Sequence, residues 1–413
     1  MVSWGYLKKY LKRYAKHPEM EKSKLYIVVA IDTEGPASYA LDSWDKIDKM
    51  MKRITSDDFR YAHTDSYSEG LRYSYFVMDW TAFSENPNKR VFGYSAIYEH
   101  YLRDLFAETP LKKHKDGVYW HYHHPCKDGK WRYGGWNETW GDNNEYENQI
   151  NHLIIDRQYF PNIYRAGGTI ETNEQSQWLE EWIPFDFSSR GPESISLKSI
   201  LKKLKNNICG NSTKYLWDWS RAPRDWIFYT PSAEDYQLKG TMARKIFRCA
   251  GIKSDEDCVN SKYIKEAFLF ASKRKEALFS FFTHDFYVNA DQQIYNTAKL
   301  IKSIAKDFDT VEYAYLNALD AAQKCLCCED KGSLGLTVSL DSKILIVKSN
   351  KKLFSKQPWL SAKFIDLTYK HILMQQKEET LWTVDLPLDK IEILGVGACD
   401  KVGNSTVTLT RIL

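Results

Sequence analysis

The sequence predicts an α/β fold, either a parallel sheet or a barrel, followed by a small all-β domain. Over residues 25–328, apolar runs of strand length alternate with helical patterns. Several of these runs end in acidic or imidazole side chains, and from residue 334 onward only short β patterns remain. Alternation of strands and helices favours parallel pairing, because each helix returns the chain to the same edge of the sheet.

The first expected strand is "KLYIVVAID" at 24–32, a continuous apolar run typical of a strand buried on both faces. Further strands are expected at "RYSYFVMDW" (72–80), "GVYWHYHH" (117–124), "IYRAGGT" (163–169) and "EALFSFFTHDF" (276–286). Apolar residues at helical spacing predict helices at 93–108, 173–182 and 293–308.

The pattern changes at "CCEDKGS" (327–333), which is the expected hinge. Beyond it lie "LGLTVSLDSKILIVKS", "SAKFIDLTYK", "LWTVDLP", "KIEILGVGACD" and "STVTLTRIL", all short strand patterns separated by turn residues. We therefore expect three parts: a basic segment at 1–24, an α/β domain at 25–328 and a β-sandwich at 334–413.

Composition limits the classes of function. The 413 residues are 43% hydrophobic and 27% charged, which indicates a globular protein. A net charge of +4 with scattered lysines argues against a nucleic-acid partner. The eight cysteines give no disulfide framework, and "CLCC" at 325–328 lacks a partner pair for a metal site. The aromatic content of 15% suits sugar binding, because flat rings stack on the apolar faces of pyranoses.

No targeting signal is recognisable in the sequence. The longest apolar run, "LYIVVAI" at 25–31, is too short to span a bilayer. We therefore expect a cytoplasmic protein without a transmembrane segment. The first 24 residues are basic and aromatic, a pattern that would allow peripheral contact with the inner membrane face.

Functional side chains follow three of the expected strands. Asp32 and Glu34 end the first strand, three histidines end the third, and His284 and Asp285 end the last. Active sites of parallel α/β folds gather at the carboxyl ends of strands. Alternate residues of a strand share a face, so Asp32 and Glu34 can point into one pocket, as can His121 and His123. Carboxylate and imidazole groups with one open position suit a catalytic divalent metal.

These residues lie in segments that resemble a known family. "VVAIDTEGP", "YSYFVMDW", "WHYHHP", "YRAGGT" and "FFTHDF", in this order, resemble the polysaccharide deacetylase (NodB homology) superfamily, also called carbohydrate esterase family four. The resemblance covers roughly residues 25 to 325. The tail, including "LPLDKIEILGVGACDKVGNSTV", resembles the accessory domain of a subgroup found with bacterial surface-polysaccharide genes.

The resemblance implies a distorted (β/α) barrel that removes N- or O-acetyl groups from sugars with one divalent metal. Zn²⁺ is the expected ion, with Co²⁺ or Mn²⁺ as alternatives. By the family's motifs, Asp32 would be the catalytic base and Glu34 a metal ligand. The spaced D-x-E pair departs from the family's adjacent aspartates.

The histidine motif also departs from the family pattern, because Trp120 stands where counting back from Pro125 would place the first histidine. His121 is the expected ligand at the strand end. The second histidine ligand would be His123 by strand facing, or His124 by its position before Pro125.

The remaining motifs assign further roles by resemblance. Arg165 would keep Asp32 ionised, and the glycines after it indicate a close backbone approach. His284 would be the general acid, and Asp285 would orient it, cap a helix or contact substrate. The tryptophan of the family's fourth motif would be Trp217, Trp219 or Trp226, and the polar segment 131–147 offers Trp131, Trp136 and Trp140 for sugar stacking.

The expected function is therefore that of a metal-dependent deacetylase. Its partner would be an acetylated sugar or glycan precursor, such as one for lipopolysaccharide. Two alternatives remain open: hydrolysis of a non-sugar C–N bond, and a catalytically inactive carbohydrate-binding or assembly protein. The sequence does not predict an oligomeric state.

Overall fold

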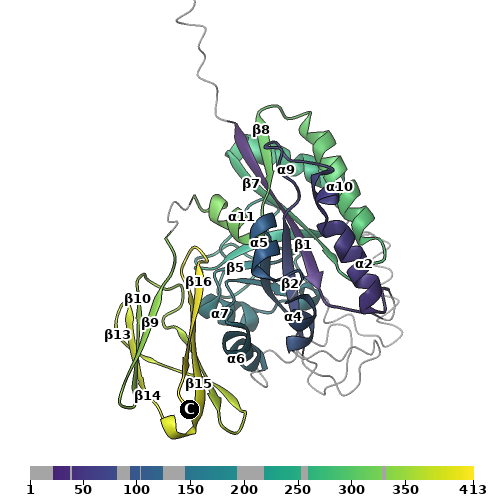
Figure 1. Cartoon of the computed structure of the whole chain (residues 1–413). Helices are drawn as coiled ribbons and strands as arrows, with labels where there is room; N and C mark the ends of the chain where they lie inside the picture. The colour runs from purple at the N-terminus through teal and green to yellow at the C-terminus, as the bar shows by residue number, and fades with distance from the viewer. Residues whose placement is uncertain are drawn as a thin grey trace, which may run out of the picture.

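Parallel strands form a barrel in the N-terminal part of the chain, and a β-sandwich lies beside it (Figure 1). The structure is a computed structural model that describes residues 22–37, 40–80, 94–102, 104–123, 145–192, 218–252, 259–327 and 332–413.

The barrel closes because its first strand pairs with two different strands along the same edge. Its strands are β1 (Ser23–Thr33), β2 (Tyr73–Trp80), β3 (Gly117–His123), β4 (Ile163–Ala166), β5 (Phe185–Ser189), β6 (Lys245–Gly251), β7 (Glu276–His284) and β8 (Val311–Tyr315). In the described residues they follow the order β2-β3-β4-β5-β6-β7-β1-β8, and β1 also pairs with β2. The carboxyl half of β1 pairs with β2, whereas its amino half pairs with β8. The ring is therefore closed at the carboxyl ends and splayed at the amino ends, which confirms the distorted (β/α) barrel.

Helices surround the strands. They are α2 (Trp44–Thr55), α3 (Asp57–Tyr61), α4 (Tyr94–Leu102), α5 (Glu108–His114), α6 (Glu145–Arg157), α7 (Asn173–Trp182), α9 (Ser261–Arg274), α10 (Ala290–Ala305) and α11 (Ala318–Cys325), with a 3₁₀ turn η2 at Gly167–Thr169. The helix predicted at 173–182 is confirmed, and Thr172 caps it by accepting from the Gln175 N–H. The helix predicted at 93–108 is wrong in length. It ends at Leu102, and the Leu105 and Phe106 N–H groups both turn back to Tyr101 O.

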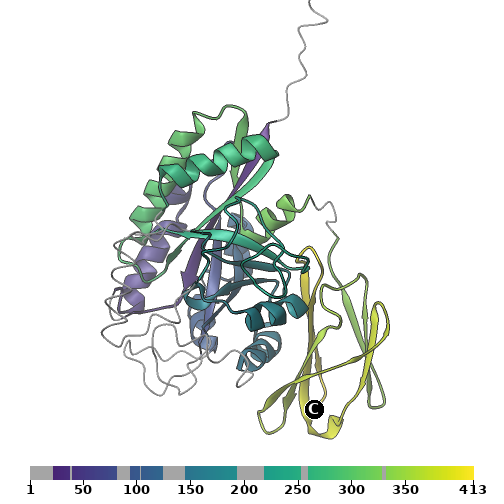
Figure 2. The ribbon, with the colours of Figure 1, turned by 180° about the vertical axis from the view of Figure 1, so that it is seen from behind.

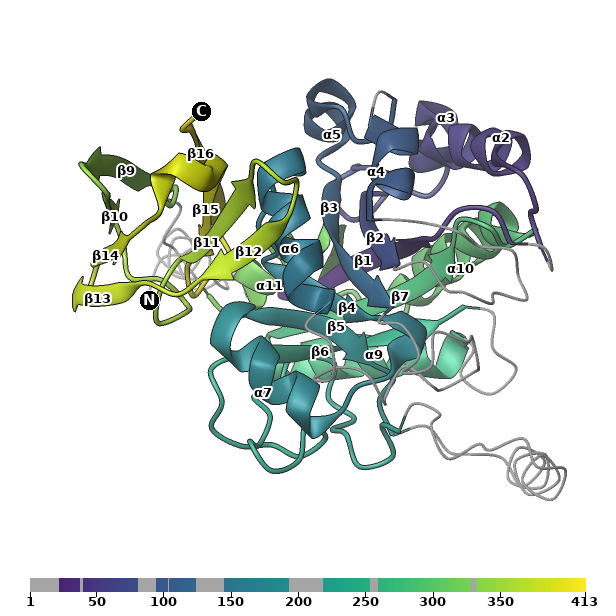
Figure 3. The same cartoon turned by 90° about the horizontal axis from the view of Figure 1, so that it is seen from below.

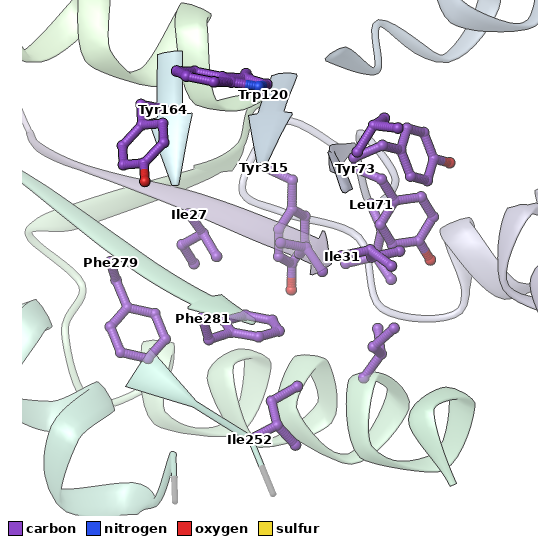
Figure 4. Packing of buried hydrophobic residues seen from close by; sticks show 14 of the residues in the cluster. Ile27, Ile31, Leu71, Tyr73, Trp120, Tyr164, Ile252, Phe279, Phe281 and Tyr315 are labelled. Carbon is purple, nitrogen blue, oxygen red and sulfur yellow. The ribbon is translucent and has the colours of Figure 1, made fainter. Parts of the chain in front are cut away.

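Two apolar layers follow from the alternation along each strand. One face of β1 carries Val28 and Ala30 into the barrel interior, where they are fully buried. The other face carries Ile27 and Ile31 into the layer beneath the helices, together with Phe279 of β7 (Figure 4). Because β1 is buried on both faces, its sequence is continuously apolar, as predicted.

The C-terminal strands form two four-stranded antiparallel sheets. One sheet contains β9 (Leu336–Asp341), β10 (Ile344–Ser349), β13 (Gln375–Glu378) and β14 (Leu381–Asp385). The other contains β11 (Trp359–Phe364), β12 (Tyr369–Ile372), β15 (Ile391–Cys399) and β16 (Ser405–Arg411), and a 3₁₀ turn η3 (Leu388–Lys390) precedes β15. Leu345 and Trp382 of the first sheet share one buried cluster with Leu360 and Val396 of the second. The predicted β-sandwich is thus confirmed.

The sandwich packs against helix α6 of the barrel, as Figures 2 and 3 show from two directions. Trp359 of β11 is fully buried and its indole N–H donates to Asn151 Oδ1 at 2.9 Å. The hydroxyl of Ser361 donates to the same oxygen at 2.7 Å. The Trp359 ring also lies edge-on to Trp182 of α7, with centroids 4.8 Å apart. The two domains are therefore joined by a buried interface.

Among the described helices, none is long and apolar enough to cross a membrane. Most of the predicted segment 1–24 and part of the predicted hinge lie outside the described residues. The domain bounds drawn from the sequence remain predictions.

Candidate metal centre

The functional strand ends meet at the closed rim of the barrel. Asp32 of β1 is the register partner of His284 of β7. On β3, His121 is the register partner of Arg165 of β4. Because all these strands run parallel around a closed ring, their carboxyl ends bring residues distant in sequence to one rim.

Glu34, His121 and His123 form a group that could hold a metal ion. The Nε2 atoms of the two histidines are 3.1 Å apart, and each lies 3.3 Å from Glu34 Oε1. Tetrahedral Zn²⁺ with bonds of about 2.0–2.1 Å requires ligand atoms roughly 3.3 Å apart. The three atoms therefore have the spacing of three tetrahedral ligands. All three side chains are buried, at 1–4% exposure.

The tautomer of His121 supports this assignment. Its Nδ1–H donates to Arg165 O at 2.9 Å, because a carbonyl oxygen can only accept. In the neutral ring the lone pair is then on Nε2, which faces Glu34 Oε1. Two acceptors so close repel each other unless a cation lies between them. The donor set thus fits a divalent ion, and the Arg165 carbonyl orients the ligand.

The ring of His123 is held by a glycine. A Cβ on Gly167 would lie 2.5 Å from Cγ of His123, so only glycine permits the backbone of η2 to pass against this imidazole. This is the close approach that the sequence predicted after Arg165, and its partner is the imidazole of His123.

Asp32 forms a buried ion pair with Arg165. The guanidinium Nε donates to Oδ1 at 2.7 Å and to Oδ2 at 3.0 Å, and Nη1 donates to Phe187 O at 2.7 Å. Burial by itself raises the pKa of Asp32, but the positive charge of Arg165, and then of His121 and His284, outweighs it and holds that pKa below its ordinary value. The carboxylate is therefore ionised and oriented beside the metal group. The Thr33 hydroxyl points elsewhere and donates to Phe76 O.

His284 lies on the other flank of Glu34. Its Nε2 is 3.3 Å from Glu34 Oε1 and 3.8 Å from Asp32 Oδ2, and these three residues form a second overlapping group. Burial opposes ionisation of Glu34, yet the positive charge of His123 and His284 in their protonated forms outweighs it and holds the pKa of Glu34 well below its ordinary value. The arrangement places a carboxylate, Asp32, and an imidazole, His284, beside a group that could hold a metal ion.

Asp285 has other partners than the sequence indicated. Its Oδ1 accepts from the Glu34 N–H and its Oδ2 from the Gly35 N–H, each at 3.0 Å, and Oδ2 also accepts from the Tyr101 hydroxyl at 2.9 Å. In the described part of the chain, Nδ1 of His284 has no hydrogen-bond partner. Asp285 is also fully buried, so the expected roles in orienting His284 and in contacting substrate are both corrected. Burial raises the pKa of Asp285 to about 6, against the lowering effect of these three donors.

Several predicted residues lie outside the described part of the chain: His124, Trp131, Trp136, Trp140 and Trp217. Of the other two tryptophans considered, Trp219 donates to Thr169 O and so supports the turn after Arg165. Trp226 packs on Phe279 in the outer layer. Sequence analysis missed Tyr101, because nothing in its helical pattern distinguishes it from an ordinary core residue.

No protein-family model and no curated protein matches the sequence. Among solved structures, a protein assigned as a polysaccharide deacetylase from Mycobacterium smegmatis is 12% identical over 75% of this chain and 92% of its own, with a TM-score of 0.31. An endo-β-1,4-mannanase from Cellulomonas fimi is 10% identical over 94% and 93%, with a TM-score of 0.33. A carbohydrate acetylesterase from Xanthomonas citri is 10% identical over 94% and 81%, with a TM-score of 0.17. Likenesses this weak carry no argument about function, which depends here on the geometry of the site.

Proposed function

We propose that the chain is a metal-dependent hydrolase that removes an N-acetyl or O-acetyl group from a sugar of a surface glycan or its precursor. The observation that carries the proposal is the tetrahedral spacing of Glu34, His121 and His123 beside an ionised Asp32. The choice of an acetylated sugar comes from the five family-like segments. Four of these five segments contain the residues of this site.

The residues divide the chemistry among them. Glu34, His121 and His123 would hold the divalent ion, which when bound polarises an acyl oxygen and lowers the pKa of a water molecule. Asp32, kept ionised by Arg165, accepts the proton of the attacking water. His284, on the opposite flank of Glu34, donates a proton to the departing amine or alcohol. Burial of the group strengthens each of these interactions, because the local dielectric is low.

The proposal is tested on the full chain by two measurements. The purified protein is loaded with Zn²⁺, Co²⁺ or Mn²⁺, its metal content is determined, and acetate release is followed from a panel of N- and O-acetylated sugars. One ion per chain and acetate release from at least one sugar are expected. His121→Ala should lose both.

The matched control is His114→Ala. His114 ends helix α5, which precedes the amino end of β3, whereas His121 lies near the carboxyl end of that strand. This variant should keep metal and activity. One bound ion without acetate release, but with release of ammonia or amine from non-sugar amides, would favour the C–N hydrolase. Sugar binding without metal or turnover would favour the inactive binding protein.

A further inference from the structure

The turn that carries Glu34 lies beyond the ladder of its own strand. The pairing of β1 with β7 ends at Asp32, and its pairing with β2 ends at Thr33. The backbone of Glu34 and Gly35 therefore needs another support if the ligand oxygen is to stay within 3.3 Å of two imidazoles. Without one, the fluctuations of a free turn would act directly on the metal geometry.

Asp285 supplies that support. Its two carboxylate oxygens accept from the successive N–H groups of Glu34 and Gly35, and its own N–H donates to Asp32 O at 3.1 Å. Asp285 therefore forms hydrogen bonds with the backbone on both sides of Thr33. Because Asp285 follows His284 directly, the same contacts also fix the end of β7 against the end of β1.

Helix α4 holds this arrangement from outside. The Tyr101 hydroxyl donates to Asp285 Oδ2, and the fully buried Ile97 lies against the turn. Gly35 has φ +71°, and a Cβ there would lie 2.9 Å from both Ile97 and Trp44. The turn is thus packed between Asp285 and helices α2 and α4. The Tyr101 hydroxyl holds the Asp285 carboxylate in place, and that carboxylate in turn holds the backbone of Glu34 and Gly35.

Asp285 is neither a ligand nor a catalytic residue. It belongs to neither group of metal-binding side chains found in the described residues, and it is 0% exposed. We propose that Asp285, held by Tyr101, is a positioning residue that sets the Glu34 carboxylate for metal binding. The inference rests on the proposed function, because it assumes that Glu34 binds the ion.

The test measures the zinc affinity of the folded full chain by chelator competition, the visible spectrum of the Co²⁺-loaded protein, and the thermal midpoint. In Asp285→Asn one carboxylate oxygen is replaced by an NH2 group, which cannot accept, so one of the two N–H donors of Glu34 and Gly35 loses its acceptor. Zinc affinity should fall about 10- to 100-fold and the Co²⁺ spectrum should change. Tyr101→Phe removes one hydrogen bond and should weaken zinc binding about 2- to 10-fold.

Two controls remove similar groups far from the rim. Asp65 is a buried carboxylate that accepts from the N–H groups of Tyr67, Glu69 and Tyr315, and Tyr315 pairs with Ile27 in the amino half of β1. Tyr73 donates its hydroxyl to Ile54 O. Asp65→Asn and Tyr73→Phe should lower the thermal midpoint and leave zinc affinity and the Co²⁺ spectrum unchanged.

The outcomes separate the two proposals. If the wild-type chain binds no metal, the proposed function fails. If it binds zinc but Asp285→Asn behaves like Asp65→Asn, with a lower midpoint and unchanged affinity, Asp285 is only a folding residue and the positioning inference is overturned. If Asp285→Asn does not fold, Tyr101→Phe decides: wild-type affinity in that variant overturns the inference, and weaker affinity supports it.

Discussion

Asp32 and Glu34 are two carboxylates two residues apart, and their surroundings give them different roles. Asp32 faces Arg165, whereas Glu34 faces the imidazoles. Asp32→Asn should keep the metal but lower turnover roughly 10²–10⁴-fold, the usual contribution of a general base. Glu34→Gln should weaken metal binding, with partial recovery of activity in excess zinc. Metal stoichiometry and deacetylation rate, measured in parallel, check both; loss of metal from Asp32→Asn alone would reverse the roles.

Asp32→Asn should also destabilise the folded protein, because Asp32 is part of a buried ion pair. Arg165 is fully buried, and its guanidinium forms an ion pair with Asp32. Removing one partner of a buried ion pair costs about 3–5 kcal/mol, so Asp32→Asn should also lower the free energy of unfolding. Denaturant unfolding of the metal-free protein measures this effect, and an unchanged midpoint would contradict it.

Gly167 gives a second prediction at the residue scale. In Gly167→Ala the added methyl would meet the ring of His123, which must then move away from Glu34 and His121. Zinc affinity should therefore fall, by about 10-fold or more. Gly335→Ala is the control, because its Cβ would meet nothing closer than 3.4 Å and lies in the sandwich. Equal zinc affinity in the two variants would show that His123 is not held by this contact.

At the scale of elements, a buried charge cluster ties β5 and α7 to the start of β6. Arg244 donates to Glu171 Oε1 at 2.8 Å, to Asp186 Oδ2 and to Ser176 O. Asp186 also accepts from the Ser188 N–H, and the Ser188 hydroxyl accepts from the Ala166 N–H next to Arg165. The cluster therefore stabilises the strand ends that carry the site.

This cluster holds two carboxylates for one guanidinium, which predicts a pH dependence. Burial, only partly offset by Arg244, raises the pKa of Glu171 well above its ordinary value, with Asp186 adding to the rise. The folded state then binds a proton that the unfolded state has lost above about pH 4.3, so ionisation opposes folding. Wild-type stability relative to Glu171→Gln should fall as pH rises from about 4.3 to the raised pKa.

The comparison with Asp186→Asn makes this prediction specific. Glu171→Gln should be at least as stable as wild type at pH 7, whereas Asp186→Asn should be about 3–5 kcal/mol less stable, because it removes a carboxylate that pairs with the buried Arg244 guanidinium. Denaturant unfolding at several pH values measures both. Destabilisation by Glu171→Gln that grows with pH would show the opposite sign and refute the assignment.

At the scale of the whole molecule, the sandwich is joined to the barrel by a shared core. Trp359 and Cys399 of the sandwich belong to the same buried apolar cluster as Ile154 and Trp182 of the barrel. We therefore expect one cooperative unfolding transition for both domains. Asn151→Ala, which removes the acceptor of Trp359 and Ser361, should lower that single transition; two separate calorimetric transitions in wild type would contradict the prediction.

The sandwich contributes no residue to the metal-binding groups found in the described part of the chain. Removing it should leave the ligand set in place, yet expose the apolar faces of α6 and α7. The truncated barrel should therefore bind metal only under conditions that keep it soluble, with a lower thermal midpoint than the full chain. Loss of metal from a soluble, folded barrel would instead indicate that the sandwich supports the site.

The sequence by itself determined the alternation of strands and helices, the change to β strands after residue 334, and the facing of Asp32 with Glu34 and of His121 with His123. These features are local: the side chains of a strand alternate whatever the rest of the fold does. By themselves they left a parallel sheet or a barrel open, and the family resemblance was needed to predict the distorted barrel.

Only the tertiary structure decided which groups meet. His123 lies against Gly167, Asp285 binds the Glu34 turn and not His284, and Trp359 enters the core of the barrel. Each of these contacts joins residues far apart in the sequence, and each depends on the closure of the ring and the packing of helices on it. No local pattern encodes such distances, because a buried carboxylate or tryptophan has the same sequence signature whichever partner it finds.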